Sequence, residues 1–184
     1  MSQKGMVIKM TDIIIWENQS IVTFNNVPAS YENSFICAVL EQAAAEGINI
    51  DMIAQSPATS DKISFGFTFG DDDMTKLLKI INSKEKMTEI QPPIVNVGNV
   101  VKVYKSNNDI SSYSPPLINS GNVKVTVKSR EMVDNTGFAS KVFSALKKLG
   151  CLPLLVTTGV DEISMLIHHS VRVDLEKELR DIFS

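Results

Sequence analysis

The sequence predicts an α+β protein in which one structural unit occurs twice along a chain of 184 residues. Similar segments recur at an offset of 103 positions (136 − 33 = 103) and, after a three-residue deletion in the second copy, at an offset of 100 (161 − 61 = 100). The matched segments are residues 22–24 with 125–127, 33–35 with 136–138, Gly47 with Gly150, and 61–64 with 161–164. This recurrence predicts a duplicated unit, so function should be sought in the unit and in the contact between its copies.

The predicted elements follow the same order in both copies. In the first, β-branched and aromatic residues predict a strand at 19–24, and an apolar stripe predicts a helix that Ser34 caps and Gly47 ends. Alternation predicts strands at 48–53 and 63–69, and three aspartates precede a second helix. The second copy repeats this with strands at 123–127, 154–156 and 163–167, a helix that Gly150 ends, and a last helix that Asp174 caps. Two helices on one face of an antiparallel sheet form a ferredoxin-like arrangement.

A ferredoxin-like unit needs a fourth strand, which the β-α-β-β-α pattern does not supply. For the first copy we expect it at residues 94–105, where valines recur. Nothing remains after the last helix of the second copy, so residues 11–15 at the other end of the chain are expected to complete its sheet and interlock the units. We therefore expect a first domain at 11–105, a loop-rich linker at 106–122 and a second domain at 123–184.

Composition excludes several classes of protein. A net charge of −3 provides no basic surface for nucleic acid or anionic membranes. No apolar run approaches about 18 residues, and no signal-peptide core follows the start, so we expect a cytoplasmic protein. Cys37 and Cys151 do not correspond in the repeat and are expected to be separate, buried thiols.

Catalytic patterns are not found in the sequence. It shows no nucleophile–base pair, no paired carboxylates of the kind found in a cleft and no phosphate-binding loop, so we expect neither an enzyme nor a cofactor. His168 and His169 are adjacent on a predicted strand and point to opposite faces, which disfavours a shared metal.

The repeated segments resemble the paired ACT domains of bacterial aspartokinases. Val27-Pro28, the run Gly-Ile-Asn-Ile-Asp-Met-Ile-Ala-Gln-Ser at 47–56 and Ile-Ser-Phe at 63–65 resemble the first domain; segments 125–132, 137–143 and 162–164 resemble the second. The resemblance spans residues 11–184, and no segment resembles the family's kinase part. It implies paired ACT domains that dimerise through their sheets and bind an end-product amino acid, commonly lysine or threonine, between domains.

The resemblance implies ligand-binding residues in both copies. They are Asn49, Ile50, Asp51 and Gln55 in the first copy, and Met132, Asp134, Asn135, Thr136, Gly137 and Phe138 in the second. Backbone N–H groups at a helix start suit the ligand's carboxylate, a glycine allows close approach, and polar groups of a strand suit its ammonium. Gly137 is either such a glycine or simply a helix-start residue, and Asn49 and Asp51 either contact the ligand or decorate a solvent face.

The two copies differ where the family binds its ligand. In the first copy, the family's Pro-Gly falls on Asn33-Ser34 and its loop aspartate falls near Ala29. In the second copy, the family's Ile-Asn-Ile strand falls on residues 151–153, where Pro153 removes a backbone donor. Two hypotheses stay open: a non-catalytic amino-acid-binding regulatory protein, or a partner-binding or structural module with a decayed site. For both we expect a homodimer, and a separately encoded enzyme or transporter is a candidate partner.

Overall fold

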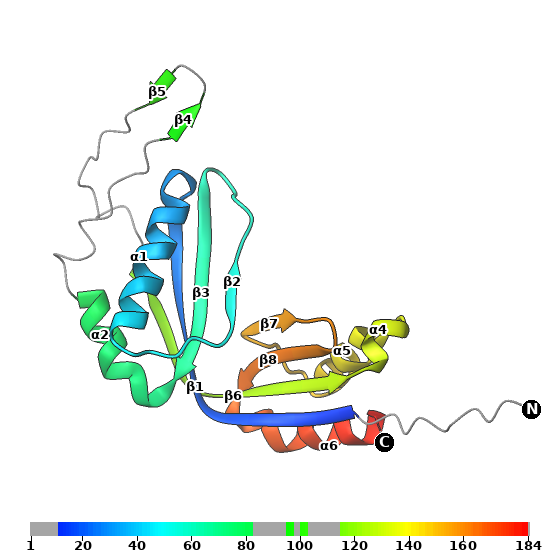
Figure 1. Ribbon diagram of the computed structural model, residues 1–184. Coiled ribbons are helices and arrows are strands. Elements are labelled where there is room, and N and C mark those ends of the chain that lie inside the picture. The colour runs from blue at the N-terminus through cyan, green and yellow to red at the C-terminus, as the bar shows by residue number, and fades with distance from the viewer. Residues whose placement is uncertain (1–10, 83–94, 98–99, 103–114, 184) are drawn as a thin grey trace, which may run out of the picture. The chain divides into compact units, whose positions relative to one another are not determined.

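The computed structural model describes residues 11–82, 95–97, 100–102 and 115–183. The chain divides into two compact units. The central unit is Ser20–Ser120, and the terminal unit combines Met1–Gln19 with Gly121–Ser184. Two long strands, β1 (Thr11–Pro28) and β6 (Leu117–Ser129), contribute to both units (Figure 1).

The central unit contains two α-helices and an antiparallel β2–β3 pair. Its elements are η1 (Ala29–Tyr31), α1 (Glu32–Ala45), β2 (Ile53–Gln55), β3 (Lys62–Gly70), η2 (Asp71–Asp73) and α2 (Met74–Asn82). In its part of the sheet the neighbours are β2, β3, β1 and β6, with Ile53 opposite Phe67 and Gln55 opposite Phe65. Positive φ angles at Ser60 and Asp61 form the tight turn between β2 and β3.

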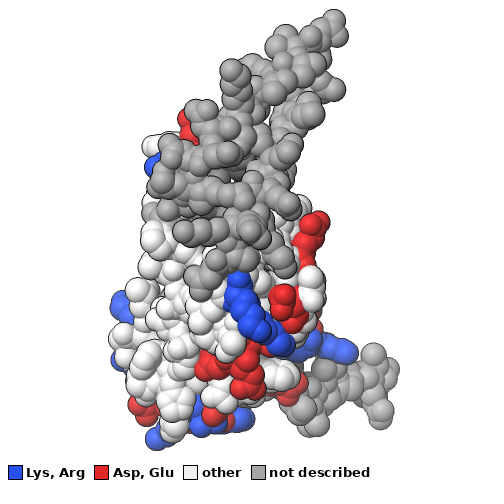
Figure 2. All heavy atoms as spheres, turned by 90° about the vertical axis from the view of Figure 1, so that its left-hand side faces the viewer, with Lys and Arg blue, Asp and Glu red and all other residues white. Residues whose placement is uncertain are grey.

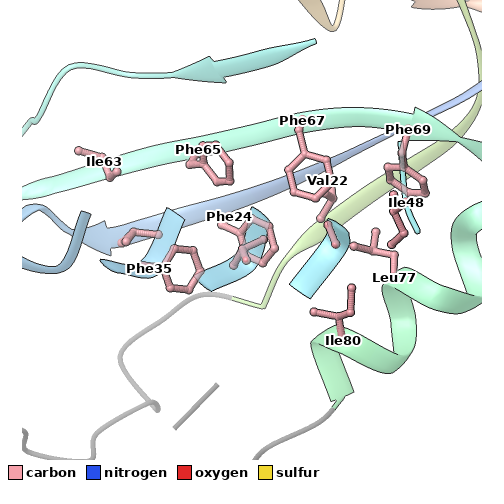
Figure 3. Packing of buried hydrophobic residues seen from close by; sticks show 13 residues of the cluster. Val22, Phe24, Phe35, Ile48, Ile63, Phe65, Phe67, Phe69, Leu77 and Ile80 are labelled. Carbon is pink, nitrogen blue, oxygen red and sulfur yellow. The ribbon is translucent and has the colours of Figure 1, made fainter. Parts of the chain in front are cut away.

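The core of the central unit is aromatic. Alternate residues of β3 point toward α1 and α2, as the period of a strand requires, and Figure 3 shows them facing Phe35 and Leu77. The buried cluster comprises Val22, Phe24, Val27, Phe35, Val39, Ala43, Ile48, Ile63, Phe65, Phe67, Phe69, Leu77 and Ile80. Phe24 packs edge-on against Phe35, with ring centroids 5.3 Å apart. Burial of these side chains is the main stabilising term of this unit.

The terminal unit repeats the arrangement. Its further elements are α4 (Glu131–Asp134), α5 (Phe138–Lys148), β7 (Leu155–Thr158), β8 (Glu162–His168), η4 (His169–Val171) and α6 (Arg172–Phe183), and its strand order is β7, β8, β6, β1. Helices α5 and α6 pack with β6 and β8 around one buried cluster. Ile13 and Ile15 of β1 pack against the same cluster. The predicted α+β fold class is thus confirmed.

The fourth strand of the central unit is not the expected one. Residues 95–97 (β4, Val95–Val97) and 100–102 (β5, Val100–Lys102) pair with each other in a separate two-stranded sheet. The rest of the expected strand at 94–105 lies outside the described residues. The position beside β1 is taken by the start of β6, where Ile118 packs against the central core. Residues 117–122, expected to be loop, are therefore strand.

Two helices and one strand begin at positions other than those expected. Helix α1 begins at Glu32 and α6 at Arg172, so Ser34 and Asp174 lie within the first turns instead of capping them. The strand expected at 48–53 begins only at Ile53. Both helix stops are confirmed, because Gly47 and Gly150 adopt the left-handed conformation, with φ of 69° and 60°.

The first strands of the two copies correspond at a different offset in the structure from the offset of 103 expected from the sequence. The N–H of Ala29 donates to the carbonyl of Asp61, and the N–H of Ser129 donates to that of Asp161, each at 2.8 Å. The strand ends therefore correspond at 100 positions (129 − 29 = 100), and the expected pairing of 22–24 with 125–127 is wrong. Asn26, with φ of 60°, forms a bulge in β1 of the first copy. The helices still match at 103, so the second copy carries three extra residues between its strand and α5.

Candidate functional site

The first group of predicted site residues lies on the segment that leads from α1 into β2. Ile48 N–H donates to the Ala43 carbonyl at 2.8 Å and closes the end of the helix. Beyond it the side chains alternate: Asn49, Asp51 and Gln55 are exposed, whereas Ile50 packs against the core and Met52 is buried. The segment thus presents three polar side chains and the half-exposed Ile53 on one face, and apolar side chains anchor it on the other.

Thr68 of β3 holds this segment in place. Its backbone carbonyl accepts from Asp51 N–H at 3.2 Å, its N–H donates to the Met52 carbonyl at 2.9 Å, and its side-chain Oγ1 accepts from Met52 N–H at 3.0 Å. Thr68 is 1% exposed, so these bonds are shielded from water. Sequence reasoning did not identify it; the available signal was a polar residue among the phenylalanines of β3.

The second group lies at the start of α5 in the terminal unit. After β6 the chain forms the short helix α4, in which Met132 packs against the core. Asn135 N–H donates to the Glu131 carbonyl at 2.8 Å and Asn135 Nδ2 donates to Glu131 Oε2 at 3.3 Å. Asp134, Asn135, Thr136 and Gly137 are exposed, and Phe138 is buried.

Gly137 is the N-cap of α5 and has a φ of 92°, a conformation that residues with a side chain rarely adopt. A Cβ at this position would meet nothing within 4 Å, so the backbone is approachable here. No side chain caps the helix, and the first N–H groups of a helix have no intrahelical partner. The local chemistry therefore suits an anionic group such as a carboxylate. The geometry is compatible with both sequence interpretations of Gly137.

The predicted residues form two groups, one in each unit. Asn49, Ile50, Asp51 and Gln55 share one segment of the central unit, while the six residues from Met132 to Phe138 share one loop of the terminal unit. That the two groups build one binding site stays a prediction.

The corresponding segment of the second copy has different chemistry. Leu154, 43% exposed, donates its N–H to the Leu166 carbonyl at 2.8 Å, which attaches this segment to β8 as the bond from Asp51 N–H to the Thr68 carbonyl attaches the first segment to β3. Leu152, 88% exposed, lies two residues after Gly150, as Asn49 lies two residues after Gly47, so a leucine stands in the place of Asn49. The second copy thus exposes apolar side chains where the first exposes polar ones.

Other classes of site are not found in the described part of the chain. Within residues 11–82 and 115–183 no three His, Cys, Asp or Glu side chains gather to hold a metal. No described helix is long and apolar enough to span a membrane. On the face shown in Figure 2, basic and acidic side chains are interspersed among uncharged ones. The described side chains on that face form no extended basic surface of the kind that binds nucleic acid.

Comparison with known proteins identifies the fold. No family model matches, and no curated protein matches by sequence. Among solved structures, the regulatory subunit of aspartate kinase from Thermus thermophilus is similar at a TM-score of 0.71 and 15% identity, covering 94% of this chain and 97% of that one. Aspartate kinase from Synechocystis is similar at a TM-score of 0.71 and 18% identity, covering 93% of this chain and 26% of that one.

A third solved structure carries a ligand. It is Escherichia coli aspartokinase III in complex with lysine and aspartate, with a TM-score of 0.58 and 15% identity, covering 94% of this chain and 33% of that one. At these identities the likeness concerns the fold, and it agrees with the resemblance seen in the repeated segments. The chain has the ACT-type fold of the regulatory region of aspartate kinases.

Proposed function

We propose that this chain is a non-catalytic regulatory protein that binds a free amino acid such as lysine or threonine at sites between its units. The observation that supports this most is the fold, which matches the Thermus regulatory subunit over nearly the full length of both chains. A related enzyme, Escherichia coli aspartokinase III, has been crystallised with lysine. Regulation without catalysis also agrees with the lack of catalytic patterns in the sequence.

The two groups of residues offer complementary chemistry for an amino acid. The start of α5, at Gly137, presents backbone N–H groups and the positive end of the helix dipole to a carboxylate. The exposed polar face at Asn49 and Asp51 supplies oxygen atoms for an ammonium group. In the proposed site, the loop of the second copy and the strand of the first copy hold opposite ends of one ligand.

We further propose that the protein is a cytoplasmic homodimer that controls a separately encoded enzyme. In the ACT family, sheets and helices of two chains pack side by side. The edge strands here carry little charge that would prevent pairing; β7, for instance, consists of Leu155, Val156, Thr157 and Thr158. Sedimentation should give about twice the mass of one 20.3 kDa chain; a species of 20.3 kDa would refute the dimer.

Calorimetry with each of the free amino acids tests ligand binding. We expect one of them to bind below millimolar concentration, and at 100 times Kd the bound ligand should add about 2.7 kcal/mol of stability in a thermal shift. Asp51→Asn and Gly137→Ala should weaken binding, whereas the control Asp72→Asn, on an exposed turn of the central unit, should not. If no amino acid binds below millimolar concentration, the proposal fails.

The alternative is a partner-binding ACT module whose ligand site has decayed. The exposed Leu152 beside Pro153 favours it, because an apolar surface in place of a polar one suits protein contact more than an amino acid. Mixing the purified protein with a separately encoded aspartate kinase and measuring a complex by sedimentation, without added amino acid, would support it. Tight amino-acid binding with no complex would count against it.

A further inference from the structure

The chain passes between the two units at two places, once in β1 and once in β6. The boundary lies between Gln19 and Ser20 in β1, and between Ser120 and Gly121 in β6. The two strands are hydrogen-bonded neighbours in the sheet. The covalent links between the units are therefore a pair of adjacent strands and not a long linker.

Both links contain a residue in the left-handed conformation. Asn18, two residues before the boundary in β1, has a φ of 56°, and Gly121, directly after the boundary in β6, has a φ of 71°. A left-handed residue departs from the extended geometry of a strand and changes its direction locally. The other described positive-φ residues lie at helix ends, in the turn between β2 and β3, or at the β1 bulge, each inside one unit.

In β1 the residues on either side of Asn18 are anchored to different units. Glu17 Oε1 lies 3.3 Å from Arg172 Nε at the start of α6, and Ile15 packs on the terminal core. On the other side, the buried Ser20 donates its hydroxyl to Asp71 Oδ1 of η2 at 2.5 Å. Glu17 and Asn18 are exposed between these anchors. The strand thus contacts the terminal unit before, and the central unit after, a short exposed stretch.

In β6 the same arrangement surrounds Gly121. Ile118 packs on the central core, and Asn122 begins the ladder with β8 opposite His168. Ser120 and Gly121 between them are exposed, and a Cβ at Gly121 would meet nothing within 4 Å. Close packing therefore does not require a glycine at position 121, whereas the positive φ angle there favours one.

We propose that Asn18 and Gly121 form a two-stranded joint about which the two units change orientation. Glycine occupies left- and right-handed φ regions almost equally, and asparagine is among the residues that tolerate the left-handed one. Domain hinges consist of a few such residues between rigidly held segments. The joint is a property of the fold and does not depend on whether an amino acid binds.

Distance measurement between spin labels tests the joint in the full-length chain. Cys37 is exposed on α1 of the central unit, and the half-buried Cys151 is replaced by serine. A second label is attached through Lys147→Cys, an exposed position on α5 of the terminal unit. Each sample is diluted with an excess of unlabelled protein, so that distances within one chain are measured even in a dimer. Circular dichroism checks that every variant is folded.

The informative comparison is Gly121→Ala against Gly150→Ala. Gly150 also has a positive φ, 60°, and open space around it, but it lies inside the terminal unit. Alanine disfavours the left-handed region by a factor of about 5 to 30. We expect Gly121→Ala to shift the distance distribution by redistributing conformers, while Gly150→Ala leaves it unchanged. Asn18→Gly, which introduces no strain, should broaden the distribution.

The proposal is overturned if Gly121→Ala and Asn18→Gly leave the distribution of the parent chain unchanged. It is also overturned if Gly150→Ala shifts the distribution as much as Gly121→Ala does.

Discussion

The glycine at position 66 of β3 should be among the least replaceable residues of the central unit. A Cβ built on Gly66 would lie 2.9 Å from the Val22 carbonyl oxygen and 3.3 Å from Thr23 Oγ1 of the neighbouring β1. The first distance is shorter than real Cβ contacts, and its partner is backbone, so β1 and β3 must move apart. Overpacking of this kind costs about 1–3 kcal/mol.

The matched control is Gly70→Ala at the end of the same strand. Gly70 has a φ of −69°, which alanine adopts freely, and a Cβ there would meet nothing within 4 Å. This substitution should be neutral or stabilise by about 0.4–1 kcal/mol, because alanine loses less chain entropy on folding. Gly66→Ala has the same favourable entropy term, but the overpacking outweighs it, so this variant should be destabilised by about 0.5–2 kcal/mol. The two variants should therefore differ by roughly 1–3 kcal/mol.

Two measurements separate the effect by unit. Hydrogen exchange of β3 amides reports the central unit, where each 1.4 kcal/mol lost should speed opening about tenfold. Fluorescence of Trp16, the only tryptophan of the chain, reports the terminal unit and should change little. Equal β3 protection in Gly66→Ala and Gly70→Ala would show that the contact with Val22 is relieved without cost and would refute this reasoning.

Three further predictions follow from single contacts. Thr68→Val leaves the buried Met52 N–H without its Oγ1 acceptor and should lower the free energy of unfolding in urea by about 1–3 kcal/mol. Thr68→Ser keeps the hydroxyl and should retain most of the stability. An equal loss in both variants would contradict the role of the hydroxyl. Ile15 is partly buried against the terminal core, so Ile15→Ala should lower the hydrogen-exchange protection of the terminal unit by about 1–2 kcal/mol, less than the cost for a fully buried isoleucine. Ile14→Ala, at a 39% exposed position, should have a smaller effect. Similar losses in the two variants would contradict the placement of β1. Burial raises the pKa of the Cys151 thiol, so its thiolate forms at higher pH than usual. The rate of alkylation of Cys151, followed by mass spectrometry, should therefore increase with pH with a midpoint above the ordinary thiol pKa of about 8.5. A midpoint below that pH would contradict this prediction.

Local patterns in the sequence were sufficient for the class of fold and for the main core elements. The alternation from Ile63 to Phe69 predicted β3 and the face it buries, because strand side chains alternate with a period of two whatever the partner strand. Gly47 and Gly150 were correctly placed at helix ends, since few other residues adopt the left-handed conformation there. The recurrence of segments predicted two units of one kind.

The tertiary structure decided which strands are neighbours and how the copies correspond. Residues 95–97 and 100–102 are as strand-like as the start of β6, but only the latter lies beside β1, because strand pairing depends on partners far away in the chain. The Asn26 bulge and the three extra residues before α5 shift the alignment without leaving a local pattern. The polar Thr68 stands out among the phenylalanines of β3, but its role does not follow from the sequence, since its acceptor atoms matter only once Asp51 and Met52 lie beside it. Periodicity reports which face of an element is buried, whereas hydrogen bonds between distant segments determine what lies next to it.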